Sequence, residues 1–513
     1  MDTDVLIVGA GPTGLMLACW LARLGIHPMV IEKKAGLTSE SRAVGVQART
    51  LETYDMLGIV DRALPQGVPV KEMNLLINRR LVGRVKMGEI GKGLSPYPYF
   101  FVMSQDRTER LLFEAFTEQA GQVRWETTIG DLVQDEQGVN VELQRADGKS
   151  ERVRARYVCG CDGASSQVRH ALNLDFPGGT YPQHFYVADA LITSPQPEGV
   201  ISISIDGDRF HALFPMPGPN HYRVLGYVPP ELTDKTDLTF EDVRSTFEDS
   251  MGAQVAKVFW FSTYNTHHRI AEHFQRGRVF LLGDAAHIHS PAGGQGMNTG
   301  LMDASNLGWK LAAVLQGEAG ERLLASYEPE RMAFAHLLVA TTDRVFTAAS
   351  SPTLRARLFR SAIVAPLFSG LSQLPQMRRW FFGTISQTRL NYRHSPMSRG
   401  AASLVQAGDR LPWVKCSDGS SNYDALCTLK VHLQVYGTVS PEIEGFTREH
   451  PEVPVKQFSF TPEAARAGLQ EGACYLLRPD GYVAYASPQF SSEELLAYLR
   501  DVWCWREVGA KVE

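Results

Sequence analysis

The chain has 513 residues, of which 44% are hydrophobic and 21% charged, and its formal net charge is −5. At about 150 residues per domain, this length predicts a globular protein of two to four domains. The slight negative charge offers no basic surface for nucleic acid, and no apolar run reaches the ~18 residues of a membrane-spanning helix. We therefore expect neither a nucleic-acid partner nor a membrane span.

The N-terminus and the cysteines both favour a cytoplasmic protein. The apolar start is similar to a signal peptide, but it carries Asp2 and Asp4 in place of a basic segment and is interrupted by glycine and proline. The seven cysteines are scattered along the chain and include no C-x-x-C pair. This pattern is typical of thiols kept in a reducing compartment.

The first 32 residues form a strand–turn–helix–strand pattern that is typical of dinucleotide binding. The apolar strand at 4–8 leads into "GAGPTG", where Gly9, Gly11 and Gly14 have G-x-G-x-x-G spacing. Gly9 allows a tight turn, Gly11 lets a pyrophosphate approach the backbone, and Gly14 lets helix and strand pack closely. The second strand ends at Glu32, an acid placed to accept hydrogen bonds from a ribose. The motif indicates an ADP-type dinucleotide without distinguishing NAD from FAD.

In two later segments, a strand again ends at an aspartate and a glycine that come before the start of a helix. In "ARYVCGCDGASSQVRHAL" the strand ends at Asp162-Gly163, and in "RVFLLGDAAHIHSPAGGQGMNTG" it ends before Asp284. Ligands of open α/β sheets bind where strand carboxyl ends meet helix N-termini. We therefore expect the three turns to surround one large cofactor.

The glycine-rich part of the third segment suits a flat ring. Gly293, Gly294 and Gly296 would let the backbone approach such a ring, and Asn298 would add a polar contact. The helix that begins near Asn298 would direct its positive end at the ring, which favours a ring that becomes anionic when reduced.

Together these segments resemble the FAD-dependent aromatic hydroxylases, which are single-component flavoprotein monooxygenases. Three signatures of that family match in order and spacing: "GAGPTG", "CDGASSQVR" and "GDAAHIHSPAGGQGMNTGLMDASNLGWKLA". The segments "SRAVGVQARTLE" and "SQDRTERLL" also match, so that the likeness covers about the first 400 residues.

The resemblance implies a set of FAD contacts. Gly11, Thr13 and Gly14 would hold the pyrophosphate, and Glu32 would bind the adenosine ribose. The other implied positions are Gly9, Pro12 and Lys33 in the same unit, Arg42 and Gln105 on neighbouring loops, Ile129 on the adenine side, Asp162 near FAD and the incoming nicotinamide, Asp284 on the ribityl chain, Pro291 at the oxygen-reaction site, and Gly294, Gln295, Gly296, Met297 and Asn298 along the isoalloxazine.

The resemblance also implies a reaction. NADPH or NADH would reduce tightly bound, non-covalent FAD, O2 would convert it to a C4a-hydroperoxide, and one oxygen atom would pass to a phenolic or polycyclic polyketide-type aromatic compound. The nicotinamide would bind transiently at a domain cleft, since no second nucleotide motif is visible. Three alternatives stay open: a flavin dehydrogenase or reductase without oxygen transfer, a Baeyer–Villiger or epoxidising monooxygenase, and a non-enzymatic FAD-stabilised binding protein.

The histidines do not indicate a metal site or a catalytic base. His287 and His289 form an H-x-H pair, but no cysteine or acid stands at ligand spacing, so we expect no metal. A surface or structural role is expected for His267 and His268. Residues 176–274 contain too many His and Tyr candidates to rank a base.

The predicted fold class is α/β, with a Rossmann-like FAD-binding domain, an inserted antiparallel-sheet substrate domain and a C-terminal segment that resembles the thioredoxin-like domain of phenol-hydroxylase relatives. Asp206-Gly207 and Asp480-Gly481 predict hairpin turns, and Ser491 with Glu494 predicts a capping box. The C-terminal domain lacks C-x-x-C, so packing or dimer contacts are expected of it, in a monomer or homodimer. The predicted boundaries are 1–72, 100–175 and 275–400 for the FAD-binding domain with its helical extension, 73–99 and 176–274 for the substrate domain, and 401–513 for the C-terminal domain.

Overall fold

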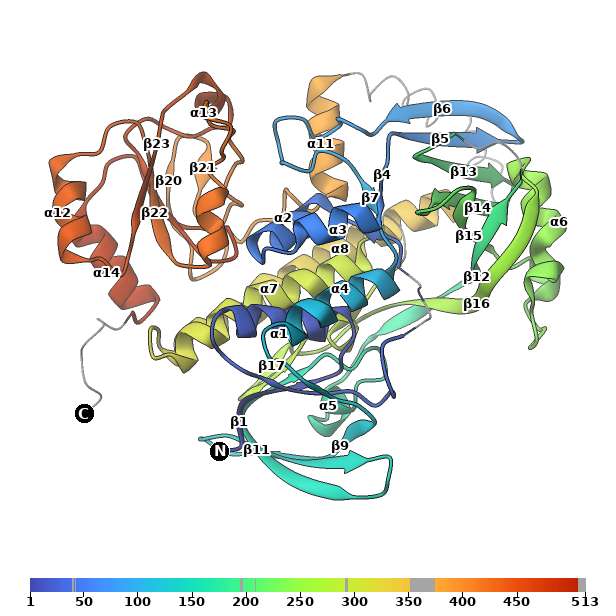
Figure 1. Cartoon of the computed structure of the whole chain (residues 1–513), viewed down its shortest axis with the longest axis horizontal. Coiled ribbons are helices and arrows are strands. Elements are labelled where there is room, and N and C mark those ends of the chain that lie inside the picture. The colour runs from blue at the N-terminus through green and yellow to red at the C-terminus, as the bar shows by residue number, and fades with distance from the viewer. Residues whose placement is uncertain are drawn as a thin grey trace.

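In a computed structural model, the described part of the chain forms four β-sheets and a central group of helices (Figure 1). The structure describes residues 1–38, 41, 43–193, 197–207, 209–290, 294–350 and 374–505, with the backbone alone for 340–350. In Figure 1 the second sheet and the C-terminal sheet lie on opposite sides of the central helices α1 and α7. The fold class is thus mixed α/β, as predicted.

The first sheet brings together the three predicted turns. Its main path is β17 (Gln275–Arg276), β18 (Val279–Leu281), β11 (Ser150–Gly160), β1 (Thr3–Val8), β2 (Met29–Ile31) and β8 (Val123–Arg124), with β10 (Val139–Arg145) and β9 (Thr127–Gln134) extending from β11. Strand β1 pairs in parallel with β2 and β11, and β11 pairs in parallel with β18. The carboxyl ends of β1, β11 and β18 therefore lie side by side, which confirms that the three turns meet.

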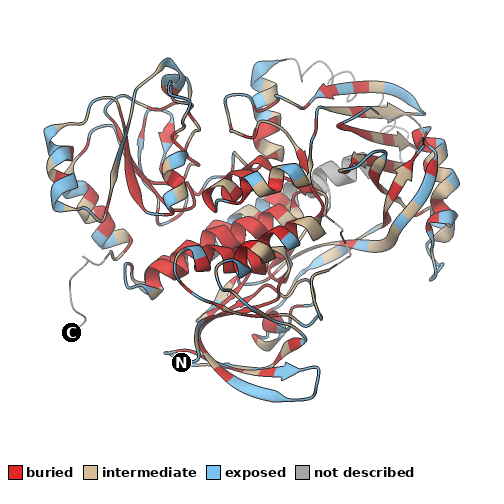
Figure 2. Ribbon diagram, viewed as in Figure 1, coloured by how far each residue is buried: buried red, intermediate tan, exposed pale blue. Residues whose placement is uncertain are grey.

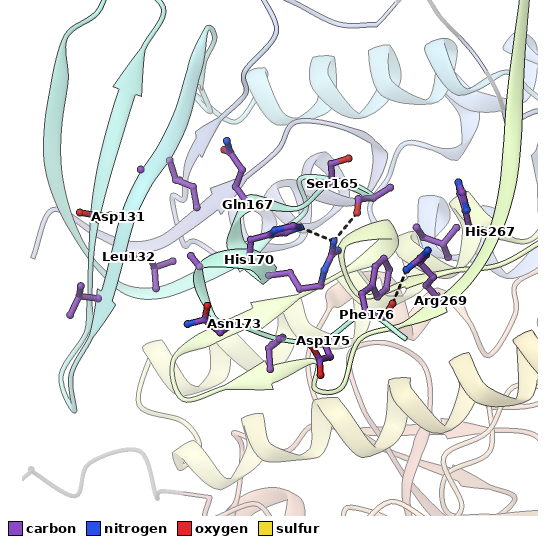
Figure 3. A pocket seen from close by; sticks show the side chains of 18 residues that line it. Asp131, Leu132, Ser165, Gln167, His170, Asn173, Asp175, Phe176, His267 and Arg269 are labelled. Atoms are coloured by element: carbon purple, nitrogen blue, oxygen red, sulfur yellow. Dashed lines mark hydrogen bonds between the residues drawn. The ribbon is translucent and has the colours of Figure 1, made fainter. Parts of the chain in front are cut away.

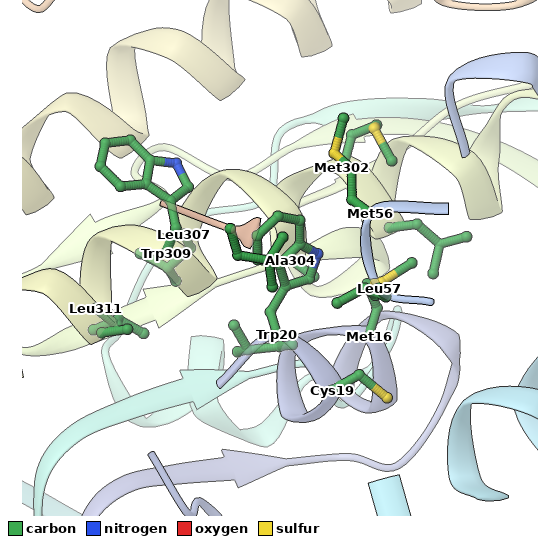
Figure 4. Close-up of a cluster of buried hydrophobic side chains, with 14 of the residues drawn as sticks. Met16, Cys19, Trp20, Met56, Leu57, Met302, Ala304, Leu307, Trp309 and Leu311 are labelled. Atoms are coloured by element: carbon green, nitrogen blue, oxygen red, sulfur yellow. The ribbon is translucent and has the colours of Figure 1, made fainter. Parts of the chain in front are cut away.

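Helices α1 (Pro12–Arg23) and α7 (Gly296–Leu315) form the core beside this sheet. Both are buried along most of their length (Figure 2) because apolar residues occupy nearly every turn. Figure 4 shows Trp20 of α1 among the side chains of α7, and its indole nitrogen donates to Ser305 Oγ at 3.1 Å. Helices α4 (Gln105–Thr117) and α5 (Gln167–Ala171) also belong to this part of the chain.

The second sheet has the order β19-β16-β12-β15-β14-β13-β5-β6. Its strands are β5 (Glu72–Ile77), β6 (Arg80–Lys86), β12 (Gly178–Ile192), β13 (Val200–Asp206), β14 (Arg209–Pro215), β15 (His221–Tyr227), β16 (Val255–Ile270) and β19 (His287–Ile288), and helix α6 (Phe240–Met251) covers one face. The predicted hairpin at Asp206 is confirmed by the pairing of β13 with β14. One pair departs from the antiparallel prediction, because β13 and β5 come from distant segments that no hairpin joins and they pair in parallel.

The C-terminal residues form a separate sheet of order β21-β20-β25-β24-β22-β23. The elements are β20 (Arg399–Ala402), β21 (Val405–Gln406), β22 (His432–Tyr436), α12 (Pro441–Glu449), β23 (Val455–Phe458), α13 (Pro462–Arg466), β24 (Cys474–Leu477), β25 (Val483–Ser487) and α14 (Ser492–Val502). The Asp480-Gly481 turn joins β24 to β25 as predicted, with Gly481 at φ +76°. Half of the predicted capping box forms: Ser491 accepts from the backbone of Glu494, whose carboxylate instead accepts from the Tyr485 hydroxyl.

The remaining elements connect these sheets. A three-stranded sheet of β3 (Gly45–Val46), β7 (Phe101–Val102) and β4 (Val68–Pro69) lies beside helices α2 (Ala48–Met56) and α3 (Val60–Ala63), and α8 (Tyr327–Ser350) and α11 (Pro375–Ile385) follow later. Within the described ranges, none of the helices has both the length and the apolar character needed to cross a membrane.

The close contact between α1 and α7 depends on Gly308. A Cβ at this position would lie 2.7 Å from Trp20 Cβ. We expect Gly308→Ala to lower the free energy of unfolding by about 1–3 kcal/mol, because the helices must separate. The control is Gly445→Ala on α12, where a Cβ meets no atom within 4 Å and where alanine should stabilise the helix. Denaturant unfolding of both variants would contradict this account if Gly308→Ala were as stable as Gly445→Ala.

Burial lowers the pKa of His211, His289 and His432 to about 4 in each case. Between that value and the unfolded pKa of about 6.5, only the unfolded chain binds the proton, so stability falls as the pH falls through this window. We expect His211→Leu to reduce the slope of unfolding free energy against pH by up to about 1.4 kcal/mol per pH unit. Val243→Ala, in the cluster under α6, is the control that should lower stability equally at every pH. An unchanged slope in His211→Leu would contradict the lowered pKa of His211.

Candidate active site

The first turn combines tight packing with one open position. A Cβ on Gly9, whose φ is +105°, would lie 2.4 Å from the Cys161 carbonyl oxygen, and one on Gly14 would lie 2.0 Å from the Gly9 oxygen. At Gly11, by contrast, no atom lies within 4 Å of an added Cβ. Gly11 is also the N-cap of α1 and has no side chain to cover the first amides of that helix. These residues therefore fit the phosphates of a dinucleotide.

Glu32 is held beside this turn by the backbone. Its Oε2 accepts from the Ala10 amide at 2.8 Å, and its Oε1 accepts from the Lys34 amide at 3.1 Å. Strand β9 begins next to it, since the Thr127 amide donates to the Glu32 carbonyl at 2.9 Å, and Ile129 is buried two residues further on. Lys33 is exposed. An acid fixed in this way can accept hydrogen bonds from ribose hydroxyls.

The loop around residue 42 is anchored from two sides. Arg42 itself lies outside the described residues, but its neighbours Ser41 and Ala43 are described. The Gln105 amide donates to Ser41 Oγ at 2.9 Å, and Gln105 Oε1 accepts from the Ala43 amide at 3.4 Å. From the second sheet, Arg223 Nη1 donates to Ser41 Oγ at 3.0 Å and to the Ala43 carbonyl at 3.1 Å.

In the second turn, the Asp162 carboxylate is engaged by its own helix. It accepts from Ser166 Oγ at 2.5 Å and from the Gln167 amide at 2.6 Å, and burial raises its pKa. Its predicted contact with FAD and nicotinamide stays a prediction. Arg169 links this turn to the third one, because its Nη1 donates to the Ala285 carbonyl at 2.9 Å.

The third turn closes onto the first helix through Thr13. A Cβ on Gly283 would lie 2.6 Å from Thr13 Oγ1, and one on Gly300 would lie 2.3 Å from the same atom. The hydroxyl of Thr13 is thus seated between the third turn, a 3-10 helix at Gly283–Ala285, and the first turns of α7. Asp284 is exposed next to Gly283.

Asn298 holds the glycine loop through a complete set of hydrogen bonds. Its buried Oδ1 accepts from the Gln47 amide and the Thr50 hydroxyl, both at 2.8 Å. Its Nδ2 donates to the carbonyls of Gly45 at 2.9 Å and Gly294 at 3.0 Å. The amide side chain predicted to touch a flat ring is therefore already satisfied by protein groups, and the uncapped first turn of α7 remains the polar feature next to Gly294.

Of the neighbouring predicted positions, Gln295 is buried at the N-cap of α7 and Gly296 begins the helix, while Met297 is half-buried. Gly294 has a φ of +62°, which favours glycine at this bend. Pro291 and Gly293 lie outside the described residues.

His287 belongs to a buried ion-pair group that sequence reasoning did not find. Its Nε2 lies 2.7 Å from Asp303 Oδ2, which also accepts from the Gly283 amide at 2.9 Å. Arg331 Nε donates to Asp303 Oδ1 at 2.6 Å. Burial alone would raise the pKa of Asp303, but Arg331 and His287 hold it below its usual value. Over the described ranges, no three acidic, His or Cys side chains gather as they would around a metal ion.

One face of the second sheet continues from the anchored loop. Arg223 is buried, forms two 2.7 Å hydrogen bonds to Asp189, and lies over the ring of Trp260. Because side chains alternate along a strand, the face that carries Arg223 and Asp189 is opposite to the face under α6.

The same face carries aromatic rings that lie four residues away from Arg223 on β15 and from Asp189 on β12. Phe185 stacks on Tyr264 at 5.5 Å between ring centroids and meets Tyr227 edge-on at 4.8 Å, and Tyr227 lies 5.1 Å from Phe210. We call Phe210, Tyr227, Phe185 and Tyr264 the aromatic row. At 3.4 Å per residue it lies about 14 Å from the Arg223–Asp189 pair.

A separate pocket of about 1140 Å³ lies between β9, α5 and the base of the second sheet (Figure 3). Ile129 lines it, together with the cationic side chains of Arg169 and Arg269. Figure 3 shows Arg269 and His267 on one side of the pocket and Gln167 on the other. The carboxylates of Asp131 and Asp175 also line the pocket, so only the part that carries the two arginines suits an anionic group.

The three turns of the first sheet define a dinucleotide-binding protein. The second, mostly antiparallel sheet adds a separate part of the molecule to it. The family model for the FAD binding domain matches residues 2–342, and the chain belongs to this family. A flavin-dependent monooxygenase of Mycobacteroides abscessus is 32% identical over 97% of this chain and 99% of its own length. The 12-dehydrotetracycline 5-monooxygenase/anhydrotetracycline 6-monooxygenase of Streptomyces rimosus is 32% identical over 98% of both chains.

The fold agrees with a solved relative. The structure of the OxyS anhydrotetracycline hydroxylase from Streptomyces rimosus superposes with a TM-score of 0.79 at 30% identity, covering 98% of this chain and 99% of the other. The chain is therefore a flavin-dependent monooxygenase whose cofactor is FAD and whose reductant is NADPH or NADH. This outcome confirms the predicted enzyme class over the dehydrogenase and the binding-protein alternatives.

Gly11 offers a direct test of the cofactor position. Its open surroundings and its φ of −73° let alanine fit the fold, so Gly11→Ala should leave the unfolding free energy of the apoprotein within about 0.5 kcal/mol. A pyrophosphate that approaches this atom would instead meet the new methyl group, and the dissociation constant for FAD should rise at least about tenfold. Titration of FAD into the apoprotein measures this, with Gly445→Ala as the control. Unchanged affinity would place the phosphates elsewhere.

Proposed function

We propose that this monooxygenase hydroxylates a flat, fused-ring aromatic compound of polyketide type. The aromatic row carries this proposal, because rings spaced 4.8–5.5 Å apart on four adjacent strands gather aromatic side chains along one face of the second sheet, where Phe210, Tyr227 and Tyr264 are half-buried around the buried Phe185. The proposal is supported by the curated relative and the solved structure from Streptomyces rimosus described above, because both of their names mention anhydrotetracycline.

We further propose that FAD contacts the predicted set of residues. The described members come from the three turns, the neighbouring loop and the start of α7: Gly9, Gly11, Pro12, Thr13, Gly14, Glu32, Lys33, Gln105, Ile129, Asp162, Asp284, Gly294, Gln295, Gly296, Met297 and, by its place in the first turn of α7 and not by its side chain, Asn298. Their support is the convergence of the β1, β11 and β18 turns around the open position at Gly11. Arg42 and Pro291 complete the set as predictions.

When bound, FAD supplies acceptance of a hydride from the reductant and activation of O2 for oxygen transfer. The protein supplies binding, orientation and charge. The amides at the α1 N-terminus would hold the pyrophosphate, and Glu32 would fix the ribose. The positive end of α7 would favour negative charge on the ring. The Arg223–Asp189 pair would orient the substrate sheet against the loop that contains Ser41. We assign no base.

We propose that the reductant binds with its anionic part in the pocket of Figure 3. Arg169 and Arg269 line that pocket, and Arg169 also donates to Ala285 in the third turn. A phosphate bound there would lie near the turn that carries Asp284. This position agrees with transient binding at a cleft between the first sheet and the second.

The division into domains is proposed as predicted from the sequence. Residues 1–72, 100–175 and 275–400 would form the FAD-binding domain, and 73–99 with 176–274 the substrate domain, which accords with β5 and β6 joining the second sheet. Residues 401–513 would form a thioredoxin-like domain without redox function. A cytoplasmic location is proposed because all seven cysteines are free thiols.

Oxygen labelling tests the reaction. The purified protein would be given NADPH or NADH, labelled O2 and a panel of phenols and fused-ring aromatics. We expect ligand-stimulated oxidation of the reductant and one labelled oxygen atom on a ring carbon of a fused-ring product. A labelled oxygen inserted beside a ketone would support the Baeyer–Villiger alternative, and reductant consumption without labelled product across the panel would contradict oxygen transfer.

The aromatic row predicts substrate selectivity. We expect Tyr227→Leu to raise the KM for a fused-ring substrate about two- to tenfold, because a stacking surface is lost. A single-ring phenol covers less of the row, so its KM should change less. The control is Tyr222→Leu on the same strand, whose side chain packs under α6 on the opposite face. An equal change of KM for both substrates would contradict the proposed role of the aromatic row.

A further inference from the structure

A group of charged side chains is buried where the C-terminal third of the chain meets α7 and α8. Its members are Asp303, Lys310, Glu330, Arg331, Arg478 and Asp480, and each side chain is at most 3% exposed. Burying charges is costly unless every one is paired, and fully paired networks fix the geometry of the groups they join. This network belongs to no element of the proposed reaction.

Arg478 occupies the centre of the group. It lies at the turn between β24 and β25 and donates to both carboxylate oxygens of Glu330, at 2.8 and 3.1 Å. It also donates to Asp480 at 2.7 and 3.0 Å. Its guanidinium lies 5.1 Å from the ring of Tyr392 and 5.6 Å from that of Tyr482. The C-terminal sheet thus inserts one cation between the helices of the flavin-binding part.

One branch leads from this turn to the glycine loop. The Asp480 carbonyl accepts from Arg49 of α2. The first turn of α2 in turn donates to Asn298, through the Gln47 amide and the Thr50 hydroxyl. Asn298 then holds the Gly294 carbonyl at 3.0 Å.

A second branch leads to the third turn. The Tyr392 hydroxyl accepts from Arg331 Nη1 at 2.9 Å, and Arg331 also donates to Asp303 and to the Thr299 carbonyl. Asp303 holds the Gly283 amide and His287. Both branches therefore end on the two backbone segments proposed to contact the flavin.

We propose that Arg478 and Tyr392 are positioning residues for the flavin, so that the C-terminal sheet, through Arg478 and the neighbouring Tyr392, sets the place of residues 283–290 and 294–298 without touching the cofactor. This inference rests on the proposed placement of FAD next to residues 283–290 and 294–298; Gly11→Ala tests the pyrophosphate end of the same FAD placement separately. We call the contacts of Arg478 and Tyr392 that lead to these backbone segments the brace. The brace would affect how tightly the protein binds FAD as well as how stable the fold is.

Two conservative variants test the brace. Arg478→Lys keeps the charge near Glu330 but loses the two-pronged contact, and Tyr392→Phe removes only the hydroxyl that accepts from Arg331. We expect the FAD dissociation constant to rise about tenfold in Arg478→Lys and about threefold in Tyr392→Phe. At saturating FAD, the flavin midpoint potential should become more negative, because the α7 N-terminus is less well aimed at the reduced ring.

The matched control is Tyr482→Phe. The ring of Tyr482 packs against that of Tyr392 at 4.4 Å between centroids and an angle of 41°, but among the described residues its buried hydroxyl has no hydrogen-bond partner. This variant should bind FAD with the affinity and the potential of the unmodified protein. If Tyr392→Phe and Arg478→Lys lower the melting temperature of the apoprotein while FAD affinity and potential match the control, the brace is overturned and the network serves stability alone. If Arg478→Lys does not fold, Tyr392→Phe alone decides between these results.

Discussion

The site depends on the close approach of three backbone turns that no side chain keeps apart. Glycine stands at each point of contact: Gly9 against Cys161, Gly14 against Gly9, and Gly283 with Gly300 around the Thr13 hydroxyl. The parallel pairing of β1, β11 and β18 brings these turns to one edge of the sheet. Gly11 differs from these four glycines, because the space around it is open. The tight packing next to it thus leaves an open position suited to a phosphate at the start of α1.

Local patterns in the sequence were sufficient to predict the elements that build this edge. The three strand–turn units and both hairpin turns follow from periodicity and turn chemistry, which act over a few residues. One local prediction was wrong because another side chain binds the predicted hydrogen-bonding group. Glu494 was expected to close a capping box, but the Tyr485 hydroxyl, nine residues away, occupies its carboxylate.

The residues that the sequence did not reveal are those whose partners lie far along the chain. Asn298 meets Gln47 across 251 residues, and Asp303 meets Arg331 across 28. No spacing rule relates such positions, so Asn298 was expected to face a ring and Asp303 was not considered. The ion pair of Arg223 with Asp189 was missed for the same reason, since it depends on the register of β15 against β12. Register across a sheet is a property of the fold, and it also brought the four aromatic rings into one row.

Strand β19 joins the first and second sheets in an unusually direct way. Only Ala286 separates the 3-10 turn at Gly283–Ala285 from His287, which is already hydrogen-bonded into the second sheet beside β16. This connection is a single residue long and cannot absorb a change in length. New substrate preferences can arise by exchanging side chains of the aromatic row, which leaves the length of this connection unchanged. An inserted or deleted residue between Ala285 and Ile288 would instead shift both sheets at once, so the length of this short segment limits how such an enzyme can diversify.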